Sequence, residues 1–249
     1  DGVEFYNGEH IIKISKFERL SLEDKKEGDY EVEILQWGKI TGNPLNDFEI
    51  HNVSKVYEPE LDKVPVMYRN AKFTEIPEWL FSKKVTSEDM SKFHNCPGLT
   101  SIPEGLFKNN VNEKYFTYTF YGCTGLTSIP GGLFKNNANA TGFDYTFESC
   151  TGLTSIPEEL FNNNVKAESF WGPFNGCTGL TSIPEGLFDN NVNATGLGNA
   201  FKGCTGLTSI PEKIIEFGKK VKEKGGIVSS MFYGCTSASN YNSIPKYLK

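Results

Sequence analysis

The chain has 249 residues, of which 38% are hydrophobic and 22% are charged, a composition that allows a buried core and argues against disorder. Its formal net charge of −6 argues against nucleic acid as a partner, because phosphate binding needs a basic patch. No apolar run approaches the roughly 20 residues of a membrane-spanning helix, so we expect no membrane span in this chain. It starts at Asp1 rather than Met, and we expect a signal peptide or anchor to lie outside it.

Residues 1–67 form the first of two predicted domains. They contain short β-rich runs, including Tyr30–Leu35 and Asp47–Ile50, bounded by turn-forming residues. We predict about three to five short antiparallel strands in this small β-rich domain. Two interpretations stay open: a cap over the open end of the repeats that follow, which we favour, or a separate module that spaces or attaches them.

Residues 68–249 form the second predicted domain, in which one sequence unit recurs. At Cys177–Phe188 the unit reads Cys-Thr-Gly-Leu-Thr-Ser-Ile-Pro-Glu-Gly-Leu-Phe. Its cysteine recurs at a spacing of 27 residues at Cys96, Cys123, Cys150, Cys177 and Cys204. A fixed period of roughly 20–50 residues is typical of a solenoid, in which each repeat stacks on its neighbours. The copies depart from the consensus at both ends, as capping units do.

Within one repeat the pattern predicts an α/β solenoid, with short parallel strands on one side and short helical turns on the other. Leu180–Ile183 is predicted to be the strand, since Pro184 ends extended pairing and suits the start of a helical turn. The Asn190–Asn191 pair is predicted to form a turn with unusual backbone angles. Phe116 and Phe120, four residues apart, are predicted to share one helical face. The leucine, isoleucine and phenylalanine positions are the predicted core.

The string Phe-x-Gly-Cys-Thr-Gly-Leu-Thr-Ser-Ile-Pro resembles the repeats of BspA-like leucine-rich repeat proteins, which are surface proteins of bacteria and protists. The resemblance covers about residues 70–249, although the period of 27 is longer than the typical unit and the strand ending is shorter. It implies a right-handed leucine-rich repeat superhelix and a location at the cell surface or outside the cell. It also implies adhesion or binding to host or partner proteins, and it brings no catalytic residues.

The six cysteines occupy a single repeat position, so they form one column along the stack. Neighbouring rows in such a stack are close enough for a disulfide, but side chains in one column point the same way and Cys is a normal core residue. We predict buried free thiols and keep a bridged pair as the alternative. Their spacing does not match a zinc site.

The candidate binding residues lie where the repeats differ, because stacking does not dictate residues at those positions. They are exposed aromatic residues, which are enriched in binding hot spots: Tyr115, Tyr118, Tyr121, Tyr145 and Trp171. The shared repeat position of Tyr118 and Tyr145 predicts that they are neighbours. The competing interpretation is that these rings merely shield the core.

We expect no enzyme, no metal and no cofactor. The three histidines are scattered, and the chain has no phosphate loop, zinc-protease motif or nucleophile elbow. A stripe of carboxylates after the proline suits a solvated face better than a calcium loop: Glu78, Glu104, Glu158, Glu185 and Glu212. The leading prediction is a surface or secreted module that binds a protein or a host component, and the alternatives are a glycan-binding module and a passive spacer.

Overall fold

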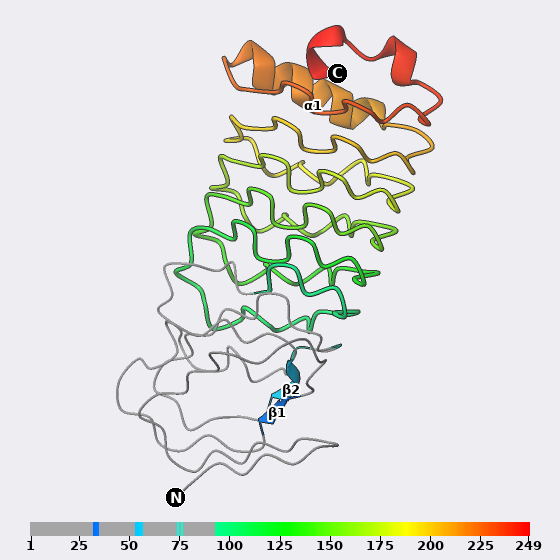
Figure 1. Cartoon of the computed structure of the whole chain (residues 1–249). Coiled ribbons are helices and arrows are strands. Elements are labelled where there is room, and N and C mark those ends of the chain that lie inside the picture. Colours follow the sequence, from blue (N-terminus) through cyan, green and yellow to red (C-terminus); the bar gives the residue numbers. More distant parts are fainter. Residues whose placement is uncertain (1–31, 35–52, 57–73, 75, 77–92) are drawn as a thin grey trace, which may run out of the picture.

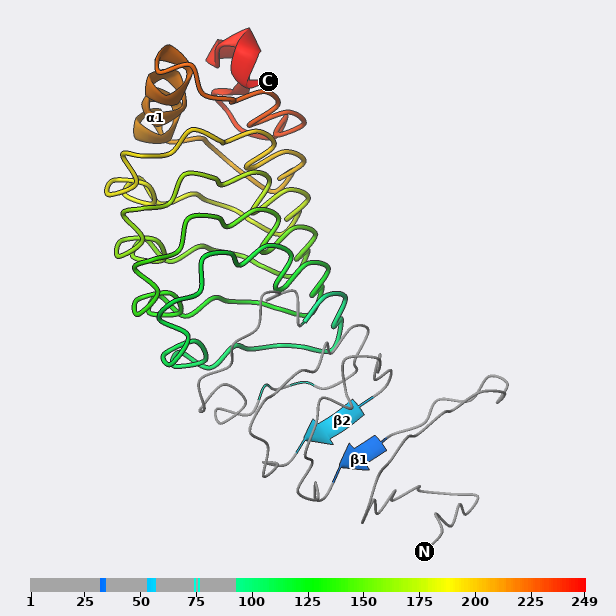
Figure 2. The ribbon, with the colours of Figure 1, turned by 90° about the vertical axis from the view of Figure 1, so that its left-hand side faces the viewer.

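The computed structural model describes residues 32–34, 53–56, 74, 76 and 93–249. From residue 93 onward the copies of the repeat stack along one axis, and helix α1 and the C-terminus lie at one end of the stack (Figures 1 and 2). The elements are β1 (Val32–Ile34), β2 (Val53–Val56), α1 (Glu212–Glu223) and the 3-10 helices η1 (Tyr241–Ser243) and η2 (Lys246–Leu248). The stacked copies confirm a solenoid, while the handedness of its superhelix and the domain boundary at 67/68 stay predictions.

In the N-terminal domain, β1 lies within the predicted run Tyr30–Leu35. It pairs with β2, with Val32 opposite Val53 and Ile34 opposite Val56, and the pairing is parallel. The antiparallel prediction is therefore wrong for this pair. The predicted run Asp47–Ile50 lies outside the described residues.

The backbone ladder between repeats runs through residues 115–122 and their equivalents. The N–H of Phe116 donates to the Gly142 carbonyl at 2.9 Å, and the N–H of Phe120 donates to the Thr146 carbonyl at 2.8 Å. Parallel bridges continue this ladder through Tyr115, Gly142, Ser169, Gly196 and Ile227. The segment predicted to be helical is thus the ladder segment, and Phe116 and Phe120 still point into the core.

The strand predicted at Leu180–Ile183 is wrong. The N–H of Leu180 turns back to the Cys177 carbonyl, and Pro184 has no N–H, so little of this segment is free to pair with a neighbour. Thr181 alone bridges to the preceding repeat, where its N–H and its hydroxyl both donate to the Thr154 carbonyl at 3.2 Å. The chain after the proline forms three-residue turns, such as that from Leu187 back to Pro184.

The core is built from stacked columns of identical side chains, as predicted. Three phenylalanine columns run along the axis: Phe93, Phe120, Phe147, Phe174, Phe201 and Phe232; Phe107, Phe134, Phe161, Phe188 and Phe217; and Phe116, Phe143 and Phe170. All six thiols are buried and free, which confirms that prediction. Cys177, for example, donates to the Phe147 carbonyl at 3.1 Å. Burial raises the pKa of Cys177 to about 12.

The predicted asparagine turns are present, with the N–H of Asn191 donating to the Phe188 carbonyl at 3.0 Å, but the second asparagine of each pair is buried and forms a ladder along the stack. Asn164 is fully buried, and its Nδ2 donates to the carbonyls of Phe134 at 3.2 Å and Asn137 at 2.8 Å in the preceding repeat. Asn137 and Asn191 make the equivalent bonds. None of these asparagines has a positive φ. The side-chain amide gives the carbonyls of Phe134 and Asn137 a second donor beside the backbone N–H groups of Asn137 and Ala140, which explains the asparagine at this position.

The last full repeat differs from the others because its four additional residues lengthen the turn region into α1. The helix begins after Pro211 and buries Ile214, Ile215 and Val221, so it covers the core at this end. The tail that follows contributes the buried Leu248, whose carbonyl accepts the N–H of Phe232 at 2.8 Å. The departure from the consensus at Cys204–Lys249 is therefore a cap, as predicted.

Candidate binding surface

The outward-facing side chains of the ladder segments form a surface that differs from repeat to repeat. At its N-terminal end this surface carries six aromatic residues, which we call the aromatic strip: His94, Tyr115, Tyr118, Tyr121, Tyr145 and Trp171. Tyr115 is 55% exposed and Tyr118 is 38% exposed, while the other four are half-buried. In the following repeats the equivalent positions hold mostly small residues, including Gly196, Gly198 and Asn199.

Tyr118 and Tyr145 form the centre of the strip. Their ring centroids lie 4.9 Å apart and their planes are within 6° of parallel, which confirms that they are neighbours. His94 also stacks with Tyr118, at a centroid distance of 6.4 Å and an angle of 14°. Tyr121 contacts His94 at 4.5 Å and Tyr118 at 5.8 Å, both edge to face. Four of the six residues thus form one connected cluster.

The backbone of both stacked tyrosines is left-handed, with φ of 56° at Tyr118 and 56° at Tyr145. This conformation costs a non-glycine residue roughly 1–2 kcal/mol, and Gly172 and Asn199 hold the equivalent positions in later repeats with φ of 57° and 58°. Glycine and asparagine suit such a backbone, whereas tyrosine does not. The local fold therefore does not require tyrosine at either position.

The stacked rings cover part of each other within the solenoid. Tyr118 and Tyr145 face each other at 4.9 Å, and His94 stacks with Tyr118 at the longer centroid distance of 6.4 Å. The far side of Tyr145 lies against Gly172, where an added Cβ would come within 2.9 Å of the ring. Both faces of Tyr145 and one face of Tyr118 are therefore covered.

Tyr115 and Trp171 each pack over a glycine of the next repeat. A Cβ at Gly142 would lie 3.0 Å from the Tyr115 ring, and one at Gly198 would lie 2.8 Å from the Trp171 ring. Among the described residues, neither ring contacts the stacked cluster. The structure therefore brings Tyr118, Tyr121 and Tyr145 together and leaves Tyr115 and Trp171 beside them.

Two carboxylates lie beside the strip. Asp144 accepts the hydroxyl of Ser169 and, at 2.9 Å, the N–H of Trp171. Glu148 accepts the amide of Asn175 at 2.7 Å. Both side chains are thereby held in place from the following repeat.

Burial raises the pKa of Tyr118, and the negative charges of Glu148 and Asp144 raise it further. Burial also raises the pKa of Tyr145, to which Tyr118 and the same two carboxylates add. Both phenols therefore stay protonated at neutral pH and can donate hydrogen bonds. Burial raises the pKa of Glu148 as well, although the bond from Asn175 opposes this.

His94 is the aromatic residue that sequence reasoning missed, because the three histidines looked unrelated. Its signal was the register: 27 residues separate it from Tyr121, and the same column continues as Glu148, Asn175 and Lys202. Asn175 and Lys202 were missed because the column that they share with His94 appears only in this register. Arranging the chain by its 27-residue period places all of them on one surface.

We searched the described residues for a metal site, for ligands in the carboxylate stripe and for a membrane helix. No cluster of three or more His, Cys, Asp or Glu suited to a metal occurs in the part of the chain that the structure describes. In the carboxylate stripe, Glu104 pairs with Lys135 at 3.4 Å and Glu158 accepts the N–H of Gly186 at 3.1 Å. No helix among the described residues is long and apolar enough to cross a membrane.

No protein-family model and no curated protein matches the sequence. Among solved structures, similar chains include one from the Drosophila Toll–Spatzle complex (18% identity, TM-score 0.29, covering 57% of this chain and 22% of that one). Leucine-rich repeat proteins of T. pallidum (21%, 0.26, 59% and 81%) and Eubacterium ventriosum (11%, 0.33, 88% and 63%) are also similar. The match thus spans less than two thirds of the Toll–Spatzle chain. At such TM-scores the similarities carry no functional argument, so function depends on the surface described above.

Proposed function

We propose that this chain is a non-catalytic module that binds a protein through the aromatic strip. The observation that carries the proposal is the pair Tyr118 and Tyr145. These tyrosines occupy left-handed backbone that disfavours them, in positions where later repeats hold glycine, asparagine or serine. Since the buried phenylalanine columns already supply the core, the rings are best explained by contacts outside the chain. Tyrosine provides a large, rigid contact area together with a hydrogen-bonding hydroxyl.

The geometry favours a protein over a glycan as the ligand. A sugar stacks on the free face of an aromatic ring, but Tyr118 and Tyr145 cover one face of each other and Gly172 lies against the far face of Tyr145. Ring edges and protonated hydroxyls suit the backbone carbonyls and polar side chains of a protein. A passive spacer would have no use for tyrosine at these positions.

The finer assignments are also part of this proposal. We infer that the solenoid is a right-handed leucine-rich repeat superhelix of the BspA-like type, displayed on a bacterial surface or secreted, and that its partner is a host or matrix component. The support is the repeated Phe-x-Gly-Cys-Thr-Gly-Leu-Thr-Ser-Ile-Pro string. A signal peptide or lipid-attachment cysteine encoded upstream would agree with this location, and an upstream sequence without any export signal would contradict it.

The test uses the double variant Tyr118→Asn/Tyr145→Asn, because Asn199 shows that asparagine fits this backbone. Losing the stack costs about 0.5–1.5 kcal/mol, and asparagine relieves part of the strain of roughly 1–2 kcal/mol at each of the two positions, so we expect the thermal midpoint not to fall by more than about 4 °C. We expect binding to a partner recovered from host extracts to weaken by about tenfold or more, as for hot-spot residues. Tyr233→Ala, at the other end of the ladder surface and 58% exposed, is the control.

A glycan array distinguishes the ligand classes. Glycan signals that disappear in the double variant would replace the protein ligand with a sugar. Equal partner recovery by the wild-type chain and the double variant would refute the assignment of the aromatic strip.

A further inference from the structure

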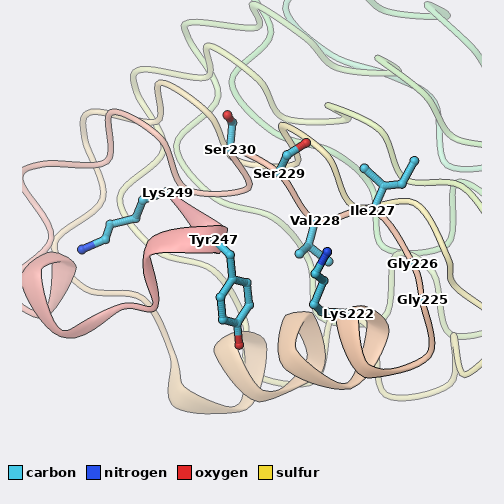
Figure 3. Close-up of a pocket in the computed structure, with 9 residues that line it drawn as sticks. All are labelled: Lys222, Gly225, Gly226, Ile227, Val228, Ser229, Ser230, Tyr247 and Lys249. Carbon is cyan, nitrogen blue, oxygen red and sulfur yellow. The ribbon is translucent and has the colours of Figure 1, made fainter.

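The C-terminal end of the solenoid, where α1 and the C-terminus lie, is away from the aromatic strip. There a cleft of about 450 Å³ lies between α1, the last ladder segment and η2 (Figure 3). Its floor is the segment 225–230, and Lys222 and Tyr247 stand on its two sides. This volume is within the roughly 300–1,000 Å³ typical of ligand pockets.

The floor of this cleft is the last rung of the backbone ladder. In each earlier repeat, three groups pair with the next repeat, as in the first described copies: the Lys114 carbonyl accepts the N–H of Gly142, and the N–H groups of Phe116 and Tyr118 donate to Gly142 and Asp144. The pattern repeats along the stack up to the last copy.

In the last copy the three equivalent groups are the Gly226 carbonyl and the N–H groups of Val228 and Ser230. In the described part of the chain, none of the three has a hydrogen-bond partner, and all three residues line the cleft. The next donor along, the N–H of Phe232, is already bonded to the Leu248 carbonyl at 2.8 Å. The C-terminal tail thus pairs with the N–H of Phe232 and leaves the three groups at Gly226, Val228 and Ser230 without a partner in the described part of the chain.

Open ladder groups are a template for an added parallel strand, which gains its affinity from main-chain hydrogen bonds and its specificity from alternate side chains. The residue that pairs with Ile227 would point outward, as the exposed Tyr115 and Ile227 do at the same ladder position. The following residue would continue the inward-facing column of Phe170, Leu197 and Val228. Val228 is only 2% exposed, so the groups that cover it must move aside for the added side chain to pack there. The site therefore fits an extended segment with an apolar residue at that position.

The positive charge of the C-terminal end of the solenoid indicates which charge the added strand should carry. Residues 212–249 contain seven lysines and three glutamates, whereas the whole chain has a net charge of −6. Lys222 is exposed at the edge of the cleft. Lys249 points away from the cleft (Figure 3) and its Nζ donates to the Tyr241 carbonyl at 3.1 Å. An acidic strand is attracted to this end and a basic one is repelled.

We propose that the cleft binds an extended acidic peptide segment of a partner protein, which adds a parallel strand to the ladder at Ile227. The segment donates one or two N–H groups to the Gly226 carbonyl and accepts from Val228 and Ser230 through two of its carbonyls. It places one apolar side chain on Val228, and its carboxylates lie near Lys222. The site is independent of the aromatic strip.

The probe is a fluorescein-labelled peptide with the sequence of residues 141–148, Thr-Gly-Phe-Asp-Tyr-Thr-Phe-Glu, which forms such a strand within the solenoid and carries two carboxylates. We expect saturable binding by fluorescence anisotropy. Methylating the nitrogens of both its threonine and its glycine removes the two N–H groups that pair backward, at 2.8 and 3.1 Å within the solenoid, and should abolish binding. Methylating the nitrogen of its first phenylalanine, whose N–H points to the opposite edge in Phe143, is the matched control and should have little effect.

On the protein, Lys222→Glu should weaken peptide binding about three- to tenfold. Lys220→Glu is the control, since Lys220 is exposed in the same last turn of α1 but does not line the cleft. Hydrogen exchange should slow at the Val228 and Ser230 amides when the peptide is added, with no change at Phe232.

Three results would overturn the proposal. The first is no binding at millimolar peptide, and the second is binding that leaves the Val228 and Ser230 amides unprotected. The third is a chain that is dimeric by light scattering with both amides already protected, because a second copy would then cover the cleft.

Discussion

The buried asparagine ladder makes a sharp prediction for Asn164→Ala. The substitution removes two hydrogen bonds, to the carbonyls of Phe134 and Asn137, from a fully buried site. Each carbonyl keeps one backbone donor, since the N–H of Asn137 donates to Phe134 and the N–H of Ala140 donates to Asn137. Each lost bond therefore costs about 1 kcal/mol, and the small cavity adds about 1 kcal/mol. The expected loss of unfolding free energy is about 3 kcal/mol.

The adjacent residue supplies the control. Asn163 is exposed and makes one bond, from its Nδ2 to the Lys135 carbonyl at 2.8 Å. Asn163→Ala should cost less than about 1 kcal/mol. Urea unfolding monitored by tryptophan fluorescence measures both variants, with the shift of the midpoint converted through the common slope. Equal losses for the two variants would refute the reasoning, because the ladder would then have no energetic role.

The isosteric variant Asn164→Asp separates hydrogen bonding from packing. It keeps the shape but replaces the donor with an acceptor that faces two carbonyl oxygens. Burial raises the pKa of such a carboxyl in the folded state, so the variant should be most stable below about pH 4, the usual Asp pKa, and lose stability as the pH rises. A variant as stable at pH 7 as at pH 4 would contradict this account.

Two further predictions concern the core. Burial raises the pKa of Cys177 from 9.0 to about 12, so the neutral thiol contributes stability that is complete below pH 9 and is lost as the pH rises toward 12. In urea unfolding at these pH values, the unfolding free energy of Cys177→Ala should decline less than that of the wild type. An identical decline would contradict the burial argument. Phe170→Ala should cost about 3–5 kcal/mol in unfolding free energy. Phe170→Leu should cost less than half as much, because Leu197 already holds the equivalent position in this column. Similar losses for both variants would show that ring stacking matters more than filled volume.

The sequence alone determined the period, the contents of the core and the partners of each side chain along the axis. A repeat of 27 residues places Cys177 over Cys150 and Tyr145 over Tyr118 without any knowledge of the backbone path. Since every repeat must bury the same face, the apolar positions could be assigned from their recurrence. The free thiols and the neighbouring tyrosines followed from this register.

The tertiary structure decided which segment carries the ladder. Both Leu180–Ile183 and residues 115–122 are short and rich in apolar or β-branched residues, so local propensity does not separate them. The outcome depends on which N–H groups are free to face the next repeat, and the turn before Thr181 and the proline after Ile183 leave few in the first segment.

The same cause explains the remaining differences. The left-handed backbone at Tyr118 and the burial of Asn164 arise from the path that the ladder imposes, and neither residue type signals it in advance. The open groups at Gly226, Val228 and Ser230 become visible only when the last rung is compared with the rungs before it. Side-chain register is a property of the repeat length, whereas hydrogen-bond partners are a property of the stacked backbone.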